Sequence, residues 1–303
     1  PAAGTMRFLH QSGVTVGVTP KTEEIHRVLK SDWKRQSTSR GLYLFNGALR
    51  RYEDLIPPEQ AEEQQAAANG NWPFTFLSTR ALTEGQSTLA DSISFGSKGK
   101  TPEHHASLVS SGVVFFNVAR GIPLQISHPI LGFDNLGKCV KELLESSRGV
   151  TLKLAEVDEQ ARLDDVPVVK LRFEIAFPRV NITTTFWVDR DRGAIPLQTV
   201  KEEVMRDLPY FTAEFANRGP SKSLQIIAVD REQIRQFHDC WMPLRWREAS
   251  ITTFADQDRE QLTIDEYAID ETDFDHPPAH AQFALEFPEP VQLHDQHRSF
   301  DMG

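Results

Sequence analysis

Two groups of residues near the end of the chain have the side-chain types that bind metal ions. His276 and His280 are four positions apart, a spacing that suits zinc when both lie on one face of a helix. Pro277 and Pro278 lie between them and forbid a regular helix, so the spacing does not predict a zinc site. The acidic run at 270–275 lacks the glycine and the distal glutamate of a calcium-binding EF-hand loop. We interpret it as a solvated acidic turn and expect no metal and no cofactor.

The sequence motifs of the common catalytic classes are missing. There is no G-x-S-x-G elbow to present a serine nucleophile, and no glycine-rich phosphate loop follows a predicted strand. His104, His105, Cys139 and Cys240 have no spacing that pairs a nucleophile with a base. Carboxylates are numerous because the chain is acidic, so they identify no acid–base pair by themselves. We expect no catalytic residues and a protein that is not an enzyme.

Composition and charge exclude several classes of partner. The chain has 303 residues, of which 39% are hydrophobic and 25% are charged, so it can form a substantial core. Its net charge of −10 and the lack of a basic stripe exclude a nucleic-acid surface. No apolar run approaches the roughly 20 residues of a membrane-spanning helix, so no transmembrane segment is expected. The two cysteines are too few for a disulfide scaffold, and they are expected as two buried thiols or as one bridge.

A long alternating stretch at 166–205 organises the predicted fold. Apolar residues occupy every second position from Val169 to Phe177, and the pattern resumes from Ile182 to Val188. A period of two places one row of side chains in a core and the other row in water. The run at 189–193 ends in glycine and reverses the chain, so a third antiparallel strand is expected after it.

Two helices are predicted to cover this sheet. The first follows a Thr19 cap and Pro20, and it carries an apolar stripe that includes Ile25 and Leu29. The second spans 135–148 and ends at a glycine cap. Because so few helices are available as crossovers, the strands are expected to be antiparallel. Further strands are expected at 41–45 and 48–52 around an Asn-Gly turn, and at 72–77, 89–95, 150–157, 224–229, 261–269 and 283–288, with another opening at 241–246.

These elements predict a single α+β domain. Its core is one large curved antiparallel sheet, an open half-barrel, with helices covering the concave face. The expected domain spans 19–293, after an N-terminal arm or first short strand at 1–18 and before a polar tail at 294–303. Insertions are expected near 57–71, 97–134 and 206–223, and the polar stretch at 97–112 is predicted to form turns.

The apolar row of the central strands is the candidate binding site. If the strands pair as predicted, one face holds Leu171, Phe173, Ile175, Phe177, Ile182 and Phe186. Two interpretations of this row stay open. Either the helices fill the face completely, or a strongly curved sheet leaves a cavity for an apolar ligand.

Three stretches of the chain follow the order of one known family. The first is the amphipathic helix ending near Trp33, which leads into the strands at 42–52. The second is 149–152 with its downstream hairpin, in which the runs W-V-D at 187–189 and I-P-L at 195–197 are similar to the family's turn. The third is the ending F-x-L-x-F-P at 283–288, where Glu289-Pro290 replaces the family's glycine. In these stretches the chain resembles the bacterial outer-membrane-lipoprotein-carrier superfamily (LolA/LolB-like, lipoprotein-sorting type).

The resemblance implies an open half-barrel whose concave side is filled by helices. Some members carry acyl chains there, and others sense misfolded envelope proteins. It also implies a location in the periplasm or cell envelope, reached through an export signal that this sequence does not contain. We therefore expect a non-enzymatic envelope protein that binds a lipid or a lipoprotein acyl chain. The alternative is a protein-interaction or sensor module with an envelope protein as partner, a fully packed sheet and no ligand cavity.

Overall fold

The computed structural model is mostly antiparallel β structure with few helices. It describes residues 3–16, 21–30, 33–46, 49–55, 74–84, 87–96, 102–110, 151–176, 180–205, 221–238, 240–254, 261–284 and 292–295. Within these residues, hydrogen bonds join strands in the order β18-β6-β5-β4-β3-β2-β1-β17-β16-β13-β12-β11-β10-β7. The chain divides into two compact units, which are described in turn: unit 1 (1–11, 37–126, 268–303) and unit 2 (12–36, 127–267).

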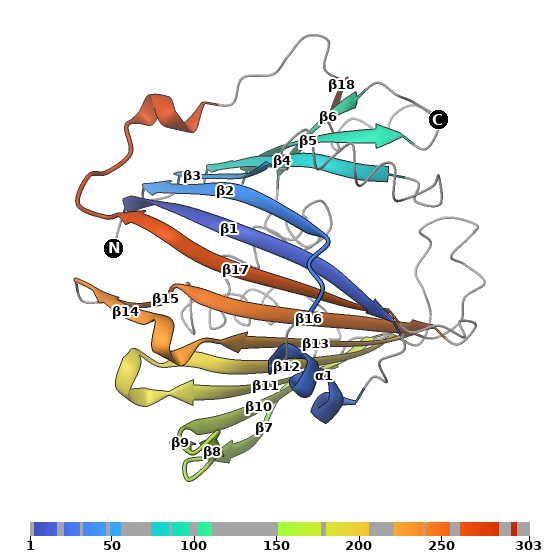
Figure 1. The fold of residues 1–303 in the computed structure, drawn as a ribbon, viewed down its shortest axis with the longest axis vertical. Helices are drawn as coiled ribbons and strands as arrows, with labels where there is room; N and C mark the ends of the chain where they lie inside the picture. The colour runs from blue at the N-terminus through green and yellow to red at the C-terminus, as the bar shows by residue number, and fades with distance from the viewer. Residues whose placement is uncertain are drawn as a thin grey trace. The chain divides into compact units, whose positions relative to one another are not determined.

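Unit 2 is built on the strands that the alternating stretch predicts (Figure 1). Its sheet and single described α-helix are β7 (Thr151–Asp158), β10 (Val169–Ala176), β11 (Val180–Asp189), β12 (Ile195–Met205), β13 (Ser221–Val229), β16 (Arg245–Phe254) and α1 (Thr22–Lys30), with parts of β1 (Ala3–Val16) and β17 (Gln261–Asp273). Two small hairpins lie beside it, β8 (Arg162–Leu163) with β9 (Val166–Pro167) and β14 (Ile234–Phe237) with β15 (Cys240–Pro243). The expected strands at 150–157, 224–229 and 261–269 are confirmed.

The central hairpin is antiparallel, as the sequence predicts. Strand β10 pairs antiparallel with β11, so that Leu171 lies opposite Phe186 and Ile175 lies opposite Ile182. At the end of β11 the chain forms a short 3-10 helix, η1 (Arg190–Arg192), followed by Gly193 with a φ of 64°. Glycine adopts this left-handed conformation without strain, so the turn closes where the sequence predicts it.

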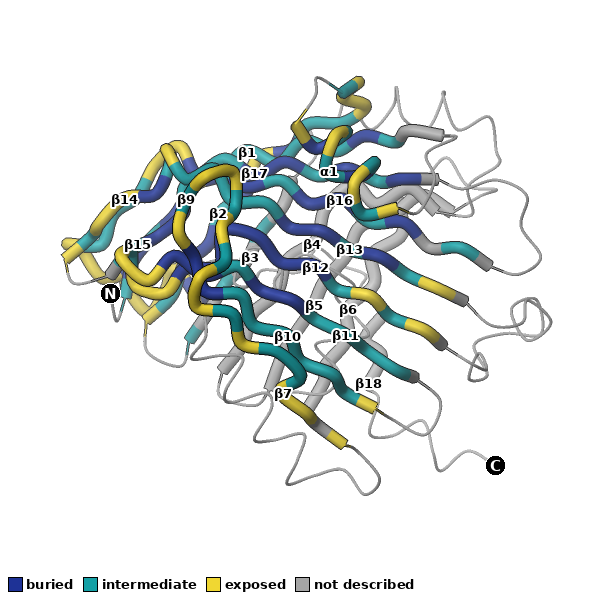
Figure 2. Tube along the Cα trace, turned by 90° about the horizontal axis from the view of Figure 1, so that it is seen from below, coloured by how far each residue is buried: buried dark blue, intermediate teal, exposed yellow. Residues whose placement is uncertain are grey.

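Helix α1 packs on one face of the unit 2 sheet, which we call the helix face. Its Ile25 and Leu29 are buried against Val200 of β12, Ile226 of β13 and Ile264 of β17. The helix begins at Thr22, after Lys21 whose carbonyl accepts from the next turn. The predicted cap at Thr19 and Pro20, and the second predicted helix at 135–148, lie outside the described residues. Burial is deepest in the strands beneath α1 and falls toward β7 (Figure 2).

A buried ion cluster joins α1 to the sheet. Glu266 of β17 is almost fully buried, and it binds the guanidinium groups of Arg245 and Arg247 of β16. Arg247 also donates to the carbonyl oxygen of Leu29, 2.6 Å away, at the C-terminal end of the helix. Cations stabilise that end because its carbonyl groups lack partners within the helix.

Unit 1 contains the remaining strands. These are β2 (Ser37–Asn46), β3 (Leu49–Leu55), β4 (Phe74–Glu84), β5 (Ser87–Gly96), β6 (Pro102–Ser110) and β18 (Gln292–Asp295), with the other parts of β1 and β17. Strands β2 and β3 pair antiparallel around the predicted Asn-Gly turn, whereas β18 pairs parallel with β6. Gly41 of β2 permits a close approach, since a Cβ there would lie 1.7 Å from the Phe8 ring of β1.

Two local expectations are wrong in unit 1. The polar stretch at 97–112 was predicted as turns, but 102–110 forms β6 in register with β5, because backbone pairing needs no apolar alternation. Phe283 was predicted to begin a strand, but it lies in a 3-10 helix, η3 (His280–Phe283), where its ring is buried. Arg51 of β3 holds this segment by donating to the carbonyl oxygens of Gln282 and Ala284.

The packing of α1 makes a direct stability prediction. Ile25→Ala removes a fully buried side chain from the helix face and should lower the free energy of unfolding by about 2 to 5 kcal/mol. Arg27→Ala, on the exposed side of the same helix, should change it by less than about 0.5 kcal/mol. Urea denaturation followed by circular dichroism measures both. Equal losses in the two variants would show that α1 is not seated on the sheet as described.

Candidate functional site

The candidate residues gather on the face of the unit 2 sheet opposite α1, which we call the far face. Cross-strand pairing places Leu171, Phe173 and Ile175 of β10 beside Phe186, Thr184 and Ile182 of β11, respectively. The register of β12 and β13 puts Val200 and Ile226, which α1 covers, on the other face. The sequence prediction that these apolar residues share one face is therefore correct. Phe177 lies outside the described residues.

Strand β7 extends this surface by two residues that the sequence did not single out. Val157 lies opposite Leu171, and Leu154 lies opposite Phe173. Their exposed fractions are 51% and 50%, respectively, high values for aliphatic side chains in a strand. We define the apolar patch as the set of far-face residues on three adjacent strands: Leu154, Val157, Leu171, Phe173, Ile175, Ile182 and Phe186.

A β-bulge explains why β7 was not recognised as part of the patch. The register between β7 and β10 shifts between Arg172 and Phe173, so Ala155 has no partner in the ladder. Leu154 and Val157 therefore share a face although they are three positions apart, and simple alternation fails there. The alternation of Leu152 and Leu154 is the one signal in the sequence that pointed to this surface.

The exposure of the patch residues decreases from β7 to β11. Phe186 is almost fully buried, whereas Leu171, Phe173, Ile175 and Ile182 are half-buried. The Phe173 and Phe186 rings meet edge to face, with their centroids 6.0 Å apart. An edge-to-face contact of this kind favours a particular orientation of both rings, whereas apolar burial alone has no preferred direction. The patch thus offers ordered apolar side chains to a ligand at its half-exposed end.

The far face becomes polar immediately beside the patch. On β12, Lys201 lies opposite Thr184 and Glu203 lies opposite Ile182. The Lys201 Nζ and Glu203 Oε2 atoms are 3.2 Å apart. On the next strand, Gln225 lies opposite Lys201, and its amide donates to the buried carboxylate of Glu248 on β16. We call Lys201, Glu203, Ser223, Gln225 and Ser250 the polar zone.

The position of α1 corrects one expectation about the site. The sequence predicted helices over the same face as the candidate lining residues, and left open whether they fill that face or leave a cavity for a ligand. Helix α1 instead covers the opposite face, over β13 and β16 (Figure 1). The helix packs on the face that carries Val200 and Ile226, because these apolar side chains complement Ile25 and Leu29 of the helix. Among the described residues, no α-helix lies over the patch.

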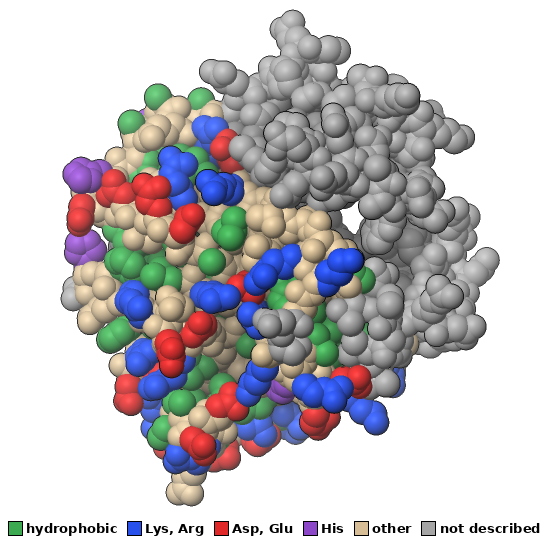
Figure 3. Space-filling view, viewed as in Figure 1, with side chains coloured by type: hydrophobic (Ala, Val, Ile, Leu, Met, Phe, Trp, Pro, Cys, Tyr) green, Lys and Arg blue, Asp and Glu red, His purple; other side chains and the backbone are tan. Residues whose placement is uncertain are grey.

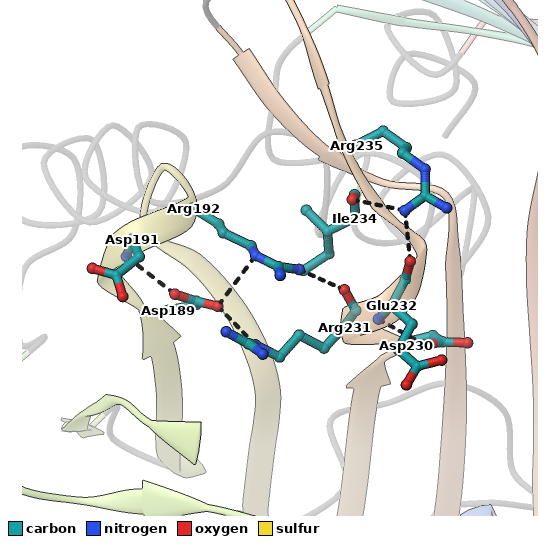
Figure 4. Close-up of polar contacts among 8 residues, drawn as sticks. All are labelled: Asp189, Asp191, Arg192, Asp230, Arg231, Glu232, Ile234 and Arg235. Carbon is teal, nitrogen blue, oxygen red and sulfur yellow. Dashed lines mark hydrogen bonds and ion pairs between the residues drawn. The ribbon is translucent and has the colours of Figure 1, made fainter.

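A polar junction fixes the end of the central hairpin (Figure 4). Asp189 has an exposed fraction of only 1%, and it accepts a hydrogen bond from the backbone N–H of Asp191. The Arg231 Nε atom lies 3.2 Å from its carboxylate, and Arg192 donates to the Arg231 carbonyl oxygen at 2.7 Å. The Arg192 guanidinium also lies over the Trp241 ring. The W-V-D motif therefore ends in a capped turn, and the polar groups of this junction bind one another.

The other candidate residues of the sequence are described only in part. Among the described residues, no cluster of histidine, cysteine, aspartate and glutamate could hold a metal ion. His276 is exposed and pairs with Asp273, and the hydrogen bond from its backbone holds the pKa of that carboxyl below its usual value. Cys139 and the Cys240 side chain lie outside the described residues, so their pairing stays open.

Figure 3 shows how charged side chains are distributed on one face of the described residues. In the view of Figure 3, lysine and arginine side chains alternate with aspartate and glutamate over the described part, and neither sign forms a broad field. No described helix combines the length and the apolarity that crossing a membrane requires. This distribution favours recognition by shape and apolar contact over electrostatic steering.

The comparisons with known proteins add little to this description. No family model matches the chain, and no curated protein matches it. Among solved structures, the crystal structure of MucB in complex with MucA(peri) is similar at 8% sequence identity over 88% of each chain, with a TM-score of 0.13. A likeness at that TM-score carries no argument about fold or function.

The polar junction makes a second stability prediction. Asp189→Ala leaves the Arg231 guanidinium and the Asp191 N–H without their acceptor, and it should lower the free energy of unfolding by about 2 kcal/mol. Asp191→Asn, which keeps the backbone donor, should cost less than about 0.5 kcal/mol. Urea denaturation distinguishes the two. A neutral Asp189→Ala would mean that the junction is not formed in solution.

His26 of α1 makes stability depend on pH. Its Nε2 atom is buried without a hydrogen-bond partner, and burial, assisted by the charge of Lys30, lowers the pKa of the imidazole below 6.5. Because the unfolded chain binds this proton first, the free energy of unfolding should fall as the pH drops through 6.5 toward the lower folded pKa. His26→Gln should remove that part of the pH dependence, while His280→Gln, at an exposed position, should leave it. Parallel slopes for wild type and His26→Gln from urea melts between pH 5 and pH 8 would contradict this.

Proposed function

We propose that this protein is a non-enzymatic binding protein that holds an apolar ligand, a lipid or an acyl chain, on the far face. The observation that supports this is the apolar patch. Leu154, Val157 and Phe173 stay partly exposed on neighbouring strands, while the helix face of the same sheet is sealed by α1. Contiguous exposed apolar surface with a polar border is typical of a ligand or partner site.

The energetics of burial are sufficient for such a ligand. Each methylene that leaves water for an apolar surface contributes about 0.8 kcal/mol. A dozen methylenes on the patch would contribute nearly 10 kcal/mol, from which the loss of translational and conformational freedom is subtracted. Micromolar binding is therefore within reach without any charged contact. Binding of this kind changes little with salt, because screening acts on charges.

The resemblance to the lipoprotein-carrier superfamily supports the same class of ligand. We include in the proposal that the ligand-binding side of the unit 2 sheet is the far face, and that the protein is located in the periplasm or cell envelope. The proposal departs from the resemblance in one respect. The ligand lies on the face away from α1, so it is not enclosed between that helix and the sheet.

The alternative is a protein-interaction module. Strand β7 ends the strand order of unit 2, and its half-exposed Leu154 and Val157 are side chains that an extended segment of an envelope protein could cover. Such a partner would use the same patch. It would not need a straight-chain ligand to bind, and this separates the two functions.

Ligand displacement tests the proposal. The uncharged fluorophore N-phenyl-1-naphthylamine should bind the folded, delipidated protein saturably, and straight-chain alcohols should displace it. Affinity should rise from octanol to dodecanol, because each added methylene removes more apolar surface from water. It should change less than about twofold between low and high salt. A folded sample that binds neither fluorophore nor alcohol would contradict the proposal and favour the interaction module.

A pair of adjacent substitutions provides the control. Thr184→Trp fills the far face between Phe173 and Lys201 and should abolish displacement, while circular dichroism shows that the fold is retained. Thr183→Trp places the same side chain on the helix face, opposite Glu174 and Glu202, and should leave binding intact. Equal losses in both variants would assign the effect to general disruption of β11.

A further inference from the structure

The polar zone restricts the chemistry of the ligand's head group. It borders the apolar patch directly, since Lys201 pairs across the sheet with Thr184 and Glu203 pairs with Ile182. Adjacent strands are about 4.8 Å apart, so a chain lying across β7, β10 and β11 ends its apolar contact where these two charges begin. We infer that the ligand is an amphiphile with an uncharged, hydroxyl-bearing head seated at the Lys201–Glu203 pair. This inference rests on the proposed function, because it concerns the same site.

A carboxylate or phosphate head does not suit this zone. Among the described residues of the far face, Lys201 is the cation that the register places beside the patch, and its Nζ atom lies 3.2 Å from the Glu203 carboxylate. An anionic head at this position would lose part of its hydration and would have to share the Lys201 ammonium group with the Glu203 carboxylate. The charge balance thus disfavours an anion.

A cationic head meets the opposite difficulty. Glu203 can receive an ammonium group only by sharing its carboxylate with Lys201, and the two cations then repel each other. Among the described residues of the zone, neither charged head therefore finds an oppositely charged partner without weakening the Lys201–Glu203 contact.

A hydroxyl head fits without breaking any of these contacts. Its oxygen can accept from the Lys201 ammonium group while its proton is donated to the Glu203 carboxylate, because both groups have further hydrogen-bonding capacity. Ser223 lies opposite Glu203 and Ser250 lies opposite Gln225, which lines the rest of the zone with groups that donate and accept. The zone is complementary to an uncharged polar head.

Competition between three ligands of equal chain length tests the inference. Dodecanol, dodecanoate and dodecylamine are each titrated against N-phenyl-1-naphthylamine bound to the full chain at neutral pH, at concentrations below those at which they aggregate. Dodecanol should bind about two- to fivefold more tightly than either charged ligand, the range expected for partly exposed charges. A preference for dodecanoate or dodecylamine, or no preference, would overturn the inference and leave the proposed function standing. Failure of all three to bind would instead overturn the proposed function.

A charge substitution should increase the relative affinity for an anionic ligand, an effect that misfolding would not produce. Glu203→Gln releases the Lys201 ammonium group, so the ratio of dodecanoate to dodecanol affinity should rise about two- to fivefold. Glu202→Gln makes the same chemical change at the next residue, on the helix face and exposed, and should leave the ratio as in wild type. An unchanged ratio in Glu203→Gln, or an equal rise in Glu202→Gln, would show that the head group does not lie at the pair.

Discussion

The packing of α1 against the sheet is the contact on which the rest of unit 2 depends. Ile25 and Leu29 supply the apolar surface that the middle strands need on one side, and each fully buried aliphatic side chain contributes about 1.5 to 3 kcal/mol. The same contact keeps the carboxylate of Glu266 in place, since Arg247 binds both that group and the end of the helix. Loss of α1 would leave a buried acid with a displaced partner, which is costly in a low-dielectric interior.

The two faces of the unit 2 sheet have opposite distributions of apolar and polar side chains. On the helix face the middle strands are apolar, and β10 is charged, with Lys170 paired to Glu156 and Arg172 paired to Glu174. On the far face the patch residues of β7, β10 and β11 are apolar, and the neighbouring Lys201, Glu203, Ser223 and Gln225 of β12 and β13 are polar. Helix α1 covers the first apolar area, whereas the second area is partly exposed.

The sequence predicted most of the strands of unit 2, because alternation directly reflects a sheet with two different faces. It did not predict which face α1 covers. Phe186 and Trp187 are adjacent on β11 and point to opposite faces of the sheet. Because both are apolar, the sequence pattern allows α1 to pack on either face. The choice depends on Val200 and Ile226, which lie in strands distant in sequence from the helix. Strand β6 was missed because its polar residues do not alternate.

The candidate site was predicted in part for similar reasons. Five of the six proposed lining residues lie together on the far face, as the alternation of two neighbouring strands indicated. Leu154 and Val157 were missed because the bulge at Ala155 breaks the period. The polar zone was missed because Lys201 and Glu203 look like ordinary exposed charges until the register places them beside the patch.

The opposite patterns also protect the sheet against mispairing. If β10 slipped by one residue against β11, Lys170, Arg172 and Glu174 would turn toward Phe186, and Leu171 and Phe173 would turn toward the charged side chains of the helix face. Both faces would lose complementarity at once, so neighbouring registers are poor competitors during folding. The apolar residues of the far face thus also help the chain to select a single alignment of its strands.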